Sequence, residues 1–107
     1  MTSRPRKVKI GYKPYRVTAV KGLSSTAGTV GLCGEDTQEI LFDPDVGKET
    51  LKEVLLHECI HGVWSQTALD KNYSDEEEEL VIWSLTPLLL ELLRDNHQLV
   101  GWLIGND

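Results

Sequence analysis

The chain has 107 residues, of which 40% are hydrophobic and 26% are charged. This composition supports a packed core and excludes wholesale disorder. The length suits one domain rather than two, so residues 1–107 are expected to form a single domain. The net charge of −6 gives no general attraction to phosphate backbones, and nucleic acid is therefore not expected as a partner.

The sequence does not predict a membrane protein. The leucine-rich stretch 80–93 is too short for a membrane span and is interrupted by polar residues and by Pro87. Because no secretory signal follows the basic residues near the N-terminus, a cytoplasmic location is expected, and a membrane is not expected as a partner. Residues 1–6 are mostly polar and contain a proline, so they are expected to be flexible.

Three strands are expected in the N-terminal part of the chain. Residues 7–20 alternate apolar and polar side chains and are predicted to form one strand, bent or bulged at Pro14. The stretch 21–28 is rich in Gly, Ser and Thr and is predicted to be a loop. Residues 29–33 and 39–42 are the second and third expected strands, and the three together predict an antiparallel meander.

The first long helix is predicted to run from about Thr50 to Gln66. Thr50 is followed three residues later by Glu53, which is the pattern of a capping box at the start of a helix. No proline interrupts the segment, and its apolar residues recur at helical spacing. These residues are Leu51, Val54, Leu55, Ile60, Val63 and Trp64.

A second long helix is predicted to begin at Ser74 or Asp75 and to end at about Arg94. Its acidic first turn suits the positive end of a helix dipole. Pro87 lies inside the predicted helix and is expected to kink or break it. The side of this helix that is expected to face the core is centred on Ile82, Leu85, Leu89 and Leu92.

These elements predict an α+β fold. A small, mostly antiparallel sheet of about three strands would pack on the first helix, with the second helix beneath it. Residues 98–104 are predicted to form a short helix or turn that closes the core with Leu99, Trp102 and Leu103. A chain this short leaves little room for a deep pocket, so a shallow groove along the sheet edge is the expected binding surface.

The segment His57-Glu58-Cys59-Ile60-His61 places the motif H-E-x-x-H inside the first predicted helix. Residues four apart on a helix point the same way, so His57 and His61 can both present a ring nitrogen to one Zn²⁺. Glu58 points to the adjacent sector, where its carboxylate can take a proton from a metal-activated water that attacks a carbonyl carbon. The apolar neighbours of both histidines indicate partly buried rings, which need partners.

A catalytic zinc normally takes three protein ligands and one water molecule, so a third ligand is needed. His97 lies in a polar turn and is expected to be solvated. Extending the apolar side of the second helix back by one turn leads to Glu78, with Glu79 on the flank. A carboxylate that faces the core is costly unless a metal compensates its charge. Glu78 is therefore the favoured third ligand, and Glu79 is the alternative.

The motif H-E-x-x-H on one helix, followed by a glutamate on a second helix, resembles the gluzincin clan of zinc metallopeptidases. In its size and order of elements, the chain is similar to the minimal SprT-like or ImmA/IrrE-like metallopeptidases that are often found in phage and prophage genomes. The resemblance implies a zincin-like fold, a Zn²⁺ cofactor and a peptide or protein substrate bound along residues 39–42 or 29–33. By this resemblance, the metal ligands would be His57, His61 and either Glu78 or Glu79. Glu58 would be the general base.

The expected function is zinc-dependent hydrolysis of peptide bonds. An alternative is a catalytically weak, zinc-stabilised protein-interaction module of phage or prophage origin. A third possibility is a peptidase whose C-terminal residues, 99–107, fold over the cleft and inhibit it. The group that stabilises the oxyanion is left open, with Tyr73, Arg94 and His97 as candidates.

Overall fold

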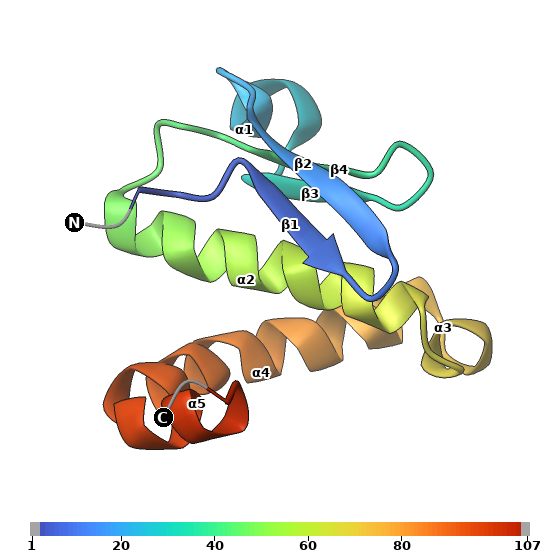
Figure 1. Cartoon of the computed structure of the whole chain (residues 1–107). Helices are drawn as coiled ribbons and strands as arrows, with labels where there is room; N and C mark the ends of the chain where they lie inside the picture. Colours follow the sequence, from blue (N-terminus) through green and yellow to red (C-terminus); the bar gives the residue numbers. More distant parts are fainter. Residues whose placement is uncertain (1–2, 106–107) are drawn as a thin grey trace.

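The protein has three layers in the computed structural model, which describes residues 3–105 (Figure 1). A four-stranded sheet packs on one side of the long helix α2, and a second long helix, α4, packs on the other side. The α+β class predicted from the sequence is confirmed. Among residues 3–105, no helix is both long enough and apolar enough to cross a membrane.

The sheet contains β1 (Lys7–Ile10), β2 (Lys13–Ala19), β3 (Gly31–Gly34) and β4 (Glu39–Phe42), in the order β1-β2-β4-β3. The pairs β1–β2 and β3–β4 are antiparallel, whereas β2 and β4 are parallel. The sheet is therefore mixed and has four strands, whereas about three were expected. Two of its three pairings are antiparallel, as expected for a mostly antiparallel sheet, but the strand order is not that of the predicted meander. Strand β3 lies at one edge of the sheet, and β4 is internal.

The fourth strand arises because residues 7–20 form a hairpin instead of one bent strand. The chain turns at Gly11, whose φ of +59° is in the left-handed region that glycine adopts without strain. Pro14 lies within β2 opposite Lys9, before the pairing with β4 begins at Arg16. Its missing N–H therefore costs no hydrogen bond of the sheet, and the strand needs no bend there.

The stretch 21–28, predicted as a loop, contains the short helix α1 (Leu23–Ala27). Asp43 follows β4 directly and is only 2% exposed. Its carboxylate accepts hydrogen bonds from the backbone N–H of Ser24 at 3.0 Å and from the Ser24 hydroxyl at 2.7 Å. A charge-assisted pair of this kind ties α1 to the end of the sheet.

Helix α2 (Lys48–Ser65) begins two residues before the predicted start. Its N-cap is Gly47, which has no side chain that could cap the helix, so the predicted Thr50–Glu53 capping box is wrong. The main core lies between α2 and the inner face of the sheet, with Cys33 and Cys59 packed at its border. Its buried members are Ile10, Tyr15, Val17, Ile40, Phe42 and Val54.

A short helix, α3 (Leu69–Asn72), connects α2 to α4 (Asp75–Asp95), so the two long helices form a hairpin (Figure 1). The predicted start of α4 is confirmed: the Ser74 hydroxyl accepts from the Glu77 N–H, and the Glu77 carboxylate accepts from the Ser74 N–H. Pro87 does not break α4. Because Pro87 has no N–H, the carbonyl of Trp83, four residues earlier, has no hydrogen-bond donor within the helix. Both residues are exposed, so water can donate that hydrogen bond instead.

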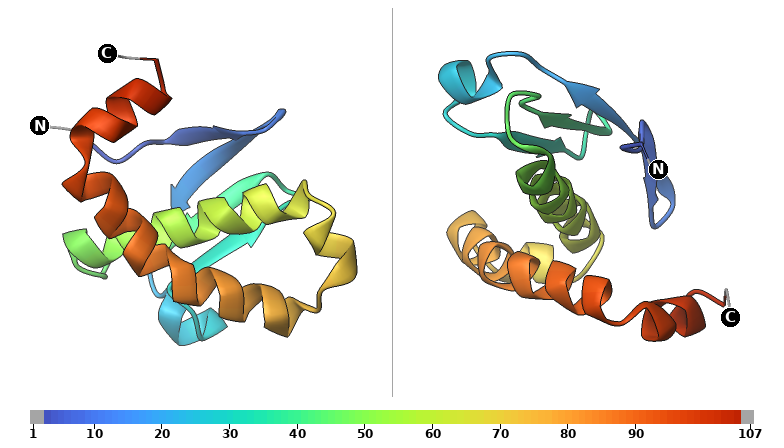
Figure 2. Two further views of the ribbon diagram at one scale, coloured as in Figure 1. Left: turned by 90° about the horizontal axis from the view of Figure 1, so that it is seen from below. Right: turned by 90° about the vertical axis from the view of Figure 1, so that its left-hand side faces the viewer.

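The C-terminal half of the helical layer differs from the prediction. Helix α5 (His97–Leu103) exists, but it packs against the end of α4 and not on the core (Figure 2). Its residues Leu99, Trp102 and Leu103 are exposed, and so are three of the four residues predicted to face the core from α4. These three are Leu85, Leu89 and Leu92, whereas Ile82 is buried.

The prediction that residues 1–6 are flexible falls partly outside the described residues, because residues 1–2 are not described. The described part lies against the sheet. The guanidinium of Arg4 is 4.9 Å from the centre of the Phe42 ring, and the Arg6 carbonyl accepts a hydrogen bond from the Val17 N–H at 2.9 Å.

Candidate metal centre

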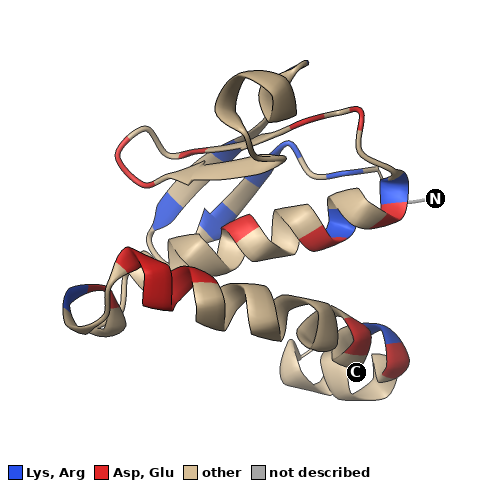
Figure 3. Ribbon diagram, turned by 180° about the vertical axis from the view of Figure 1, so that it is seen from behind, with Lys and Arg blue, Asp and Glu red and all other residues tan. Residues whose placement is uncertain are grey.

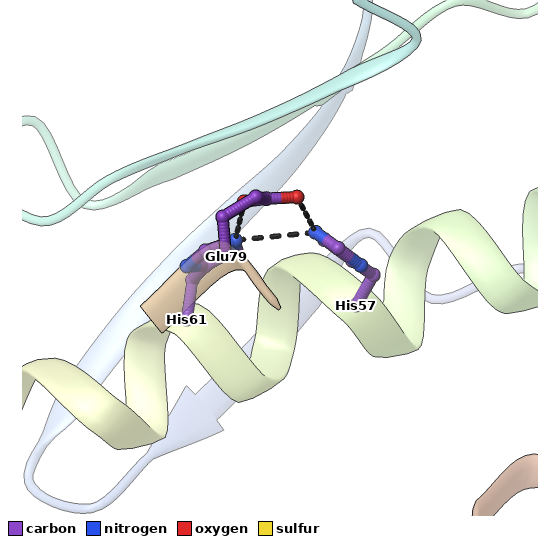
Figure 4. A group of neighbouring side chains, drawn as sticks. All are labelled: His57, His61 and Glu79. Atoms are coloured by element: carbon purple, nitrogen blue, oxygen red, sulfur yellow. Dashed lines mark hydrogen bonds and ion pairs between the residues drawn. The ribbon is translucent and has the colours of Figure 1, made fainter. Parts of the chain in front are cut away.

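The hairpin of α2 and α4 brings the predicted site residues together, because the start of α4 returns alongside the second half of α2. His57 and His61 are one helical turn apart on α2, and both side chains are largely buried. Their Nε2 atoms point to the same spot and are 3.2 Å apart (Figure 4). The sequence prediction that one face of α2 presents both rings to a common point is confirmed.

Glu79 completes this group from α4. Its two carboxylate oxygens lie 2.9 Å from Nε2 of His57 and 2.8 Å from Nε2 of His61 (Figure 4). Tetrahedral ligands at the usual zinc distances are roughly 3.3 Å apart, so these donors need only small shifts to surround one ion. The donor set of His57, His61 and Glu79 could therefore hold a metal ion.

Glu78 occupies a different place from the one expected. Its carboxylate lies 2.6 Å from Nδ1 of His61, on the side of the ring away from Glu79. The helical position predicted its burial correctly, since the Glu78 side chain is only 12% exposed. The flanking Glu79 nevertheless reaches the front of the histidine pair. Of the two glutamates left open by the sequence, Glu79 is therefore the one grouped with both Nε2 atoms, whereas Glu78 contacts the far nitrogen of the His61 ring.

The two imidazoles have opposite pKa shifts in the metal-free state. For His57, burial dominates and lowers the pKa, although Glu79 acts in the other direction. For His61, burial alone would also lower the pKa, but the hydrogen bond with Glu78 and the charges of Glu58 and Glu79 outweigh it and raise the pKa. His61 is therefore the ring that holds a proton more strongly when no ion is bound.

Glu58 lies beside the histidine pair and is 7% exposed. The pKa of the Glu58 carboxyl is raised to about 7, mainly by burial. Its Oε2 atom would lie 2.9 Å from a Cβ built on Gly31, so strand β3 approaches the carboxylate more closely than any side chain at this position would allow. Sequence reasoning missed Gly31, although a glycine inside a strand is a known signal of close backbone approach.

Two cavities flank the group. One, of about 380 Å³, is lined by His57, Glu58 and Glu79 together with apolar parts of Val30, Val54, Trp83 and Pro87. The other lies on the His61 side and is mostly acidic, with Glu35, Asp36, Asp70 and Asp75 on its walls. Acidic residues gather at the start of α4 (Figure 3), and Lys13 is the one basic residue of the described chain that lines this cavity beside them. A cation that approaches the histidines therefore meets negative charge.

The other candidates from the sequence lie elsewhere. Tyr73 packs edge-on against Trp64, and Arg94 binds Glu49 at 2.7 Å. Neither cavity beside the histidines is lined by Tyr73, Arg94 or His97. Nor do the described residues of α5 line either cavity, so they do not cover the group in this structure.

Comparison of the chain with known protein families, with curated proteins and with solved structures found no match in any of the three.

Proposed function

We propose that the chain is a zinc-dependent metallopeptidase, with His57, His61 and Glu79 as metal ligands and Glu58 as general base. The observation that carries this proposal is the convergence of two imidazole nitrogens and a carboxylate oxygen beside a buried glutamate that opens onto a cavity. When bound, Zn²⁺ would polarise a peptide carbonyl and lower the pKa of a water molecule. A gluzincin-like identity and a zincin-like fold belong to the same proposal.

In this proposal each carboxylate has a separate task. Glu79 supplies an oxygen ligand, and Glu78 accepts the Nδ1–H of His61, which fixes the tautomer that leaves Nε2 free to bind. Glu58 takes a proton from the attacking water and passes it to the leaving amine. A pKa of about 7 suits both transfers, and it predicts that the rate rises with pH towards and through neutrality as Glu58 becomes ionised.

The position of β3 supports a peptide substrate. This strand is paired along one edge only within the described residues, and its Gly31 lies against Glu58. An extended peptide that pairs with the free edge of β3 would pass next to the base and the proposed ligands. Of the two strands considered from the sequence, β3 is the one at the sheet edge, because β4 is internal.

The test is Glu58→Gln, assayed with a denatured protein substrate and a peptide library, with bound metal measured by mass spectrometry. We expect cleavage to fall on the order of 10³-fold while zinc stays bound, because the variant keeps the ligands and loses the base. Glu76→Gln, an exposed glutamate on α4, is the matched control and should leave both readouts unchanged.

Two outcomes would contradict the proposal. Zinc binding without any cleavage by the wild-type chain would favour the zinc-stabilised interaction module. A metal other than zinc would also change the assignment, because two histidines and one carboxylate are equally the ligands of non-haem iron sites.

A further inference from the structure

Helices α4 and α5 leave most of their apolar side chains uncovered. Within the described part of the chain, eighteen large hydrophobic side chains are exposed, and twelve of them lie between Leu80 and Ile104. A helix that is apolar on nearly every side is normally buried on nearly every side. Here α4 packs mainly on α2, and no element of the described chain covers its outer side (Figures 1 and 2).

The total surface area shows how much is uncovered. The chain exposes 7654 Å², whereas a compact monomer of its mass exposes about 6,000 Å², so the excess is roughly 1,700 Å². The radius of gyration, 14.3 Å, likewise exceeds the ~13 Å of a compact chain of this length. In permanent dimers each subunit buries about 1,000–2,500 Å². The excess is therefore of the size that one subunit loses in a permanent dimer.

The exposed side chains of α4 include a seam suited to helix pairing. Val81, Leu85, Leu88 and Leu92 are spaced by four, three and four residues, and all four are exposed. This spacing is that of the a and d positions of a heptad, which pack a helix against an antiparallel or parallel partner. We call these four residues the Leu88 stripe. At 100° per residue it lies about a quarter turn from Ile82, the residue of α4 that is buried against α2.

The charge of this region argues against other kinds of partner. Between Leu80 and Ile104 the charged residues are Glu91, Arg94 and Asp95, and Arg94 already binds Glu49. Helices that lie on membranes carry many Lys or Arg residues on their polar face, and nucleic-acid surfaces require the same. A second copy of the chain needs no such charge, because two Leu88 stripes that run antiparallel across a two-fold axis complement each other.

We propose that the chain forms a symmetric dimer in which the Leu88 stripes of two copies pack antiparallel, with α5 extending the contact at each end. The metal centre stays open in this arrangement. Glu79 and Trp83, which line the cavity beside His57, lie on the flank of α4 opposite the stripe. The inference does not depend on the proposed peptidase activity, since it rests on apolar area and helix register alone.

The test is sedimentation velocity of the whole chain from micromolar to submicromolar concentration. We expect a species of twice the chain mass of 12.0 kDa. Leu88→Glu and Leu85→Glu each place two charges in the apolar interface and should raise the dissociation constant on the order of 100-fold or more. Tyr12→Glu is the matched control, because Tyr12 is also a highly exposed hydrophobic residue but lies on the β1–β2 turn.

Circular dichroism of each variant separates loss of pairing from loss of folding, since both leucines are already exposed and their replacement should leave the helical signal unchanged. Four results would overturn the proposal. They are a wild-type monomer at every concentration, a dimer that both stripe variants retain, a polydisperse series of larger species, and a monomer that binds vesicles of anionic lipid.

Discussion

The two halves of α4 differ in a way that runs against their composition. The first half begins with acidic residues, yet it packs on α2. Counted over the whole residue, Glu78 is only 9% exposed and Ile82 only 1% exposed. The second half is rich in leucine, yet Leu88 is 67% exposed. The reason is geometric: beyond Thr86 the end of α4 and the start of α2 are separated by a hollow lined by Thr50, Glu53, Pro87 and Leu90 among others.

Contact of α4 with α2 is therefore made beside the candidate metal ligands and does not follow the apolar content of α4. Glu78 is buried because the imidazole of His61 faces it, with 2.6 Å between their polar atoms. The leucines beyond Pro87 have no equivalent surface on α2, since the start of that helix carries Lys48, Glu49 and Lys52. The first half of α4 therefore carries the candidate metal ligand Glu79, and the second half carries the surface proposed for the dimer.

The largest expected effect is on metal binding by the first half. His57→Ala and Glu79→Gln each remove one of three proposed ligands, so metal affinity should fall well beyond the roughly 100-fold that loss of an outer partner costs. Competition with a coloured chelator measures the affinity of each variant. Glu76→Gln, in the same turn of α4, should bind like the wild type, and an equal loss in this variant would remove Glu79 from its assigned role.

The next effect compares burial in the two halves directly. Ile82→Ala should lower the free energy of unfolding by about 2–5 kcal/mol, because it empties a buried position. Leu88→Ala should change it by no more than about 0.5 kcal/mol in a Leu85→Glu background, in which the proposed dimer is dissociated. Urea unfolding of both pairs of variants measures the difference. Equal effects of the two substitutions would mean that the second half is also packed within the monomer.

The smallest effect concerns the pH dependence of the metal-free protein. The pKa of His61 is raised, so its pairing with Glu78 stabilises the fold fully below the ordinary histidine pKa of about 6.5. This contribution is lost as the pH rises through the higher folded-state pKa. Glu78→Gln should therefore lose less stability than the wild type over that interval. The measurement is urea unfolding with a chelator present, repeated at several pH values. If the pair contributes nothing, the curves of stability against pH for the wild type and for Glu78→Gln will be parallel.

The helical part of the site could be predicted from the sequence because its signals are local. The spacing of His57 and His61 requires only a helix, and Ser74 or Asp75 before an acidic turn marks the start of α4. The choice between Glu78 and Glu79 was beyond this reasoning. A helical position gives the direction of a side chain, whereas the proposal of Glu79 as ligand rests on which nitrogen of the His61 ring each carboxylate reaches.

The sheet and the outer side of α4 were harder to predict because they depend on distant contacts. Alternation of side chains marks β2 and β4 as strands but does not show that they pair in parallel. Strand β3 lies between them in the sequence, yet it occupies the edge of the sheet beyond β4. The apolar stripe of α4 was assigned to the core because periodicity shows that a face is apolar, not what covers it. Leu85, Leu89 and Leu92 are the residues that this assumption misplaced.

The hairpin of α2, α3 and α4 confines the whole metal group to residues 57–79, a single short stretch of chain. Closing a loop of this length costs little chain entropy, so the group can assemble without waiting for the sheet. An ion bound there would link α4 to α2 within this one hairpin. Its removal would loosen the outer layer, while the core between α2 and the sheet has its own apolar contacts and would stay folded.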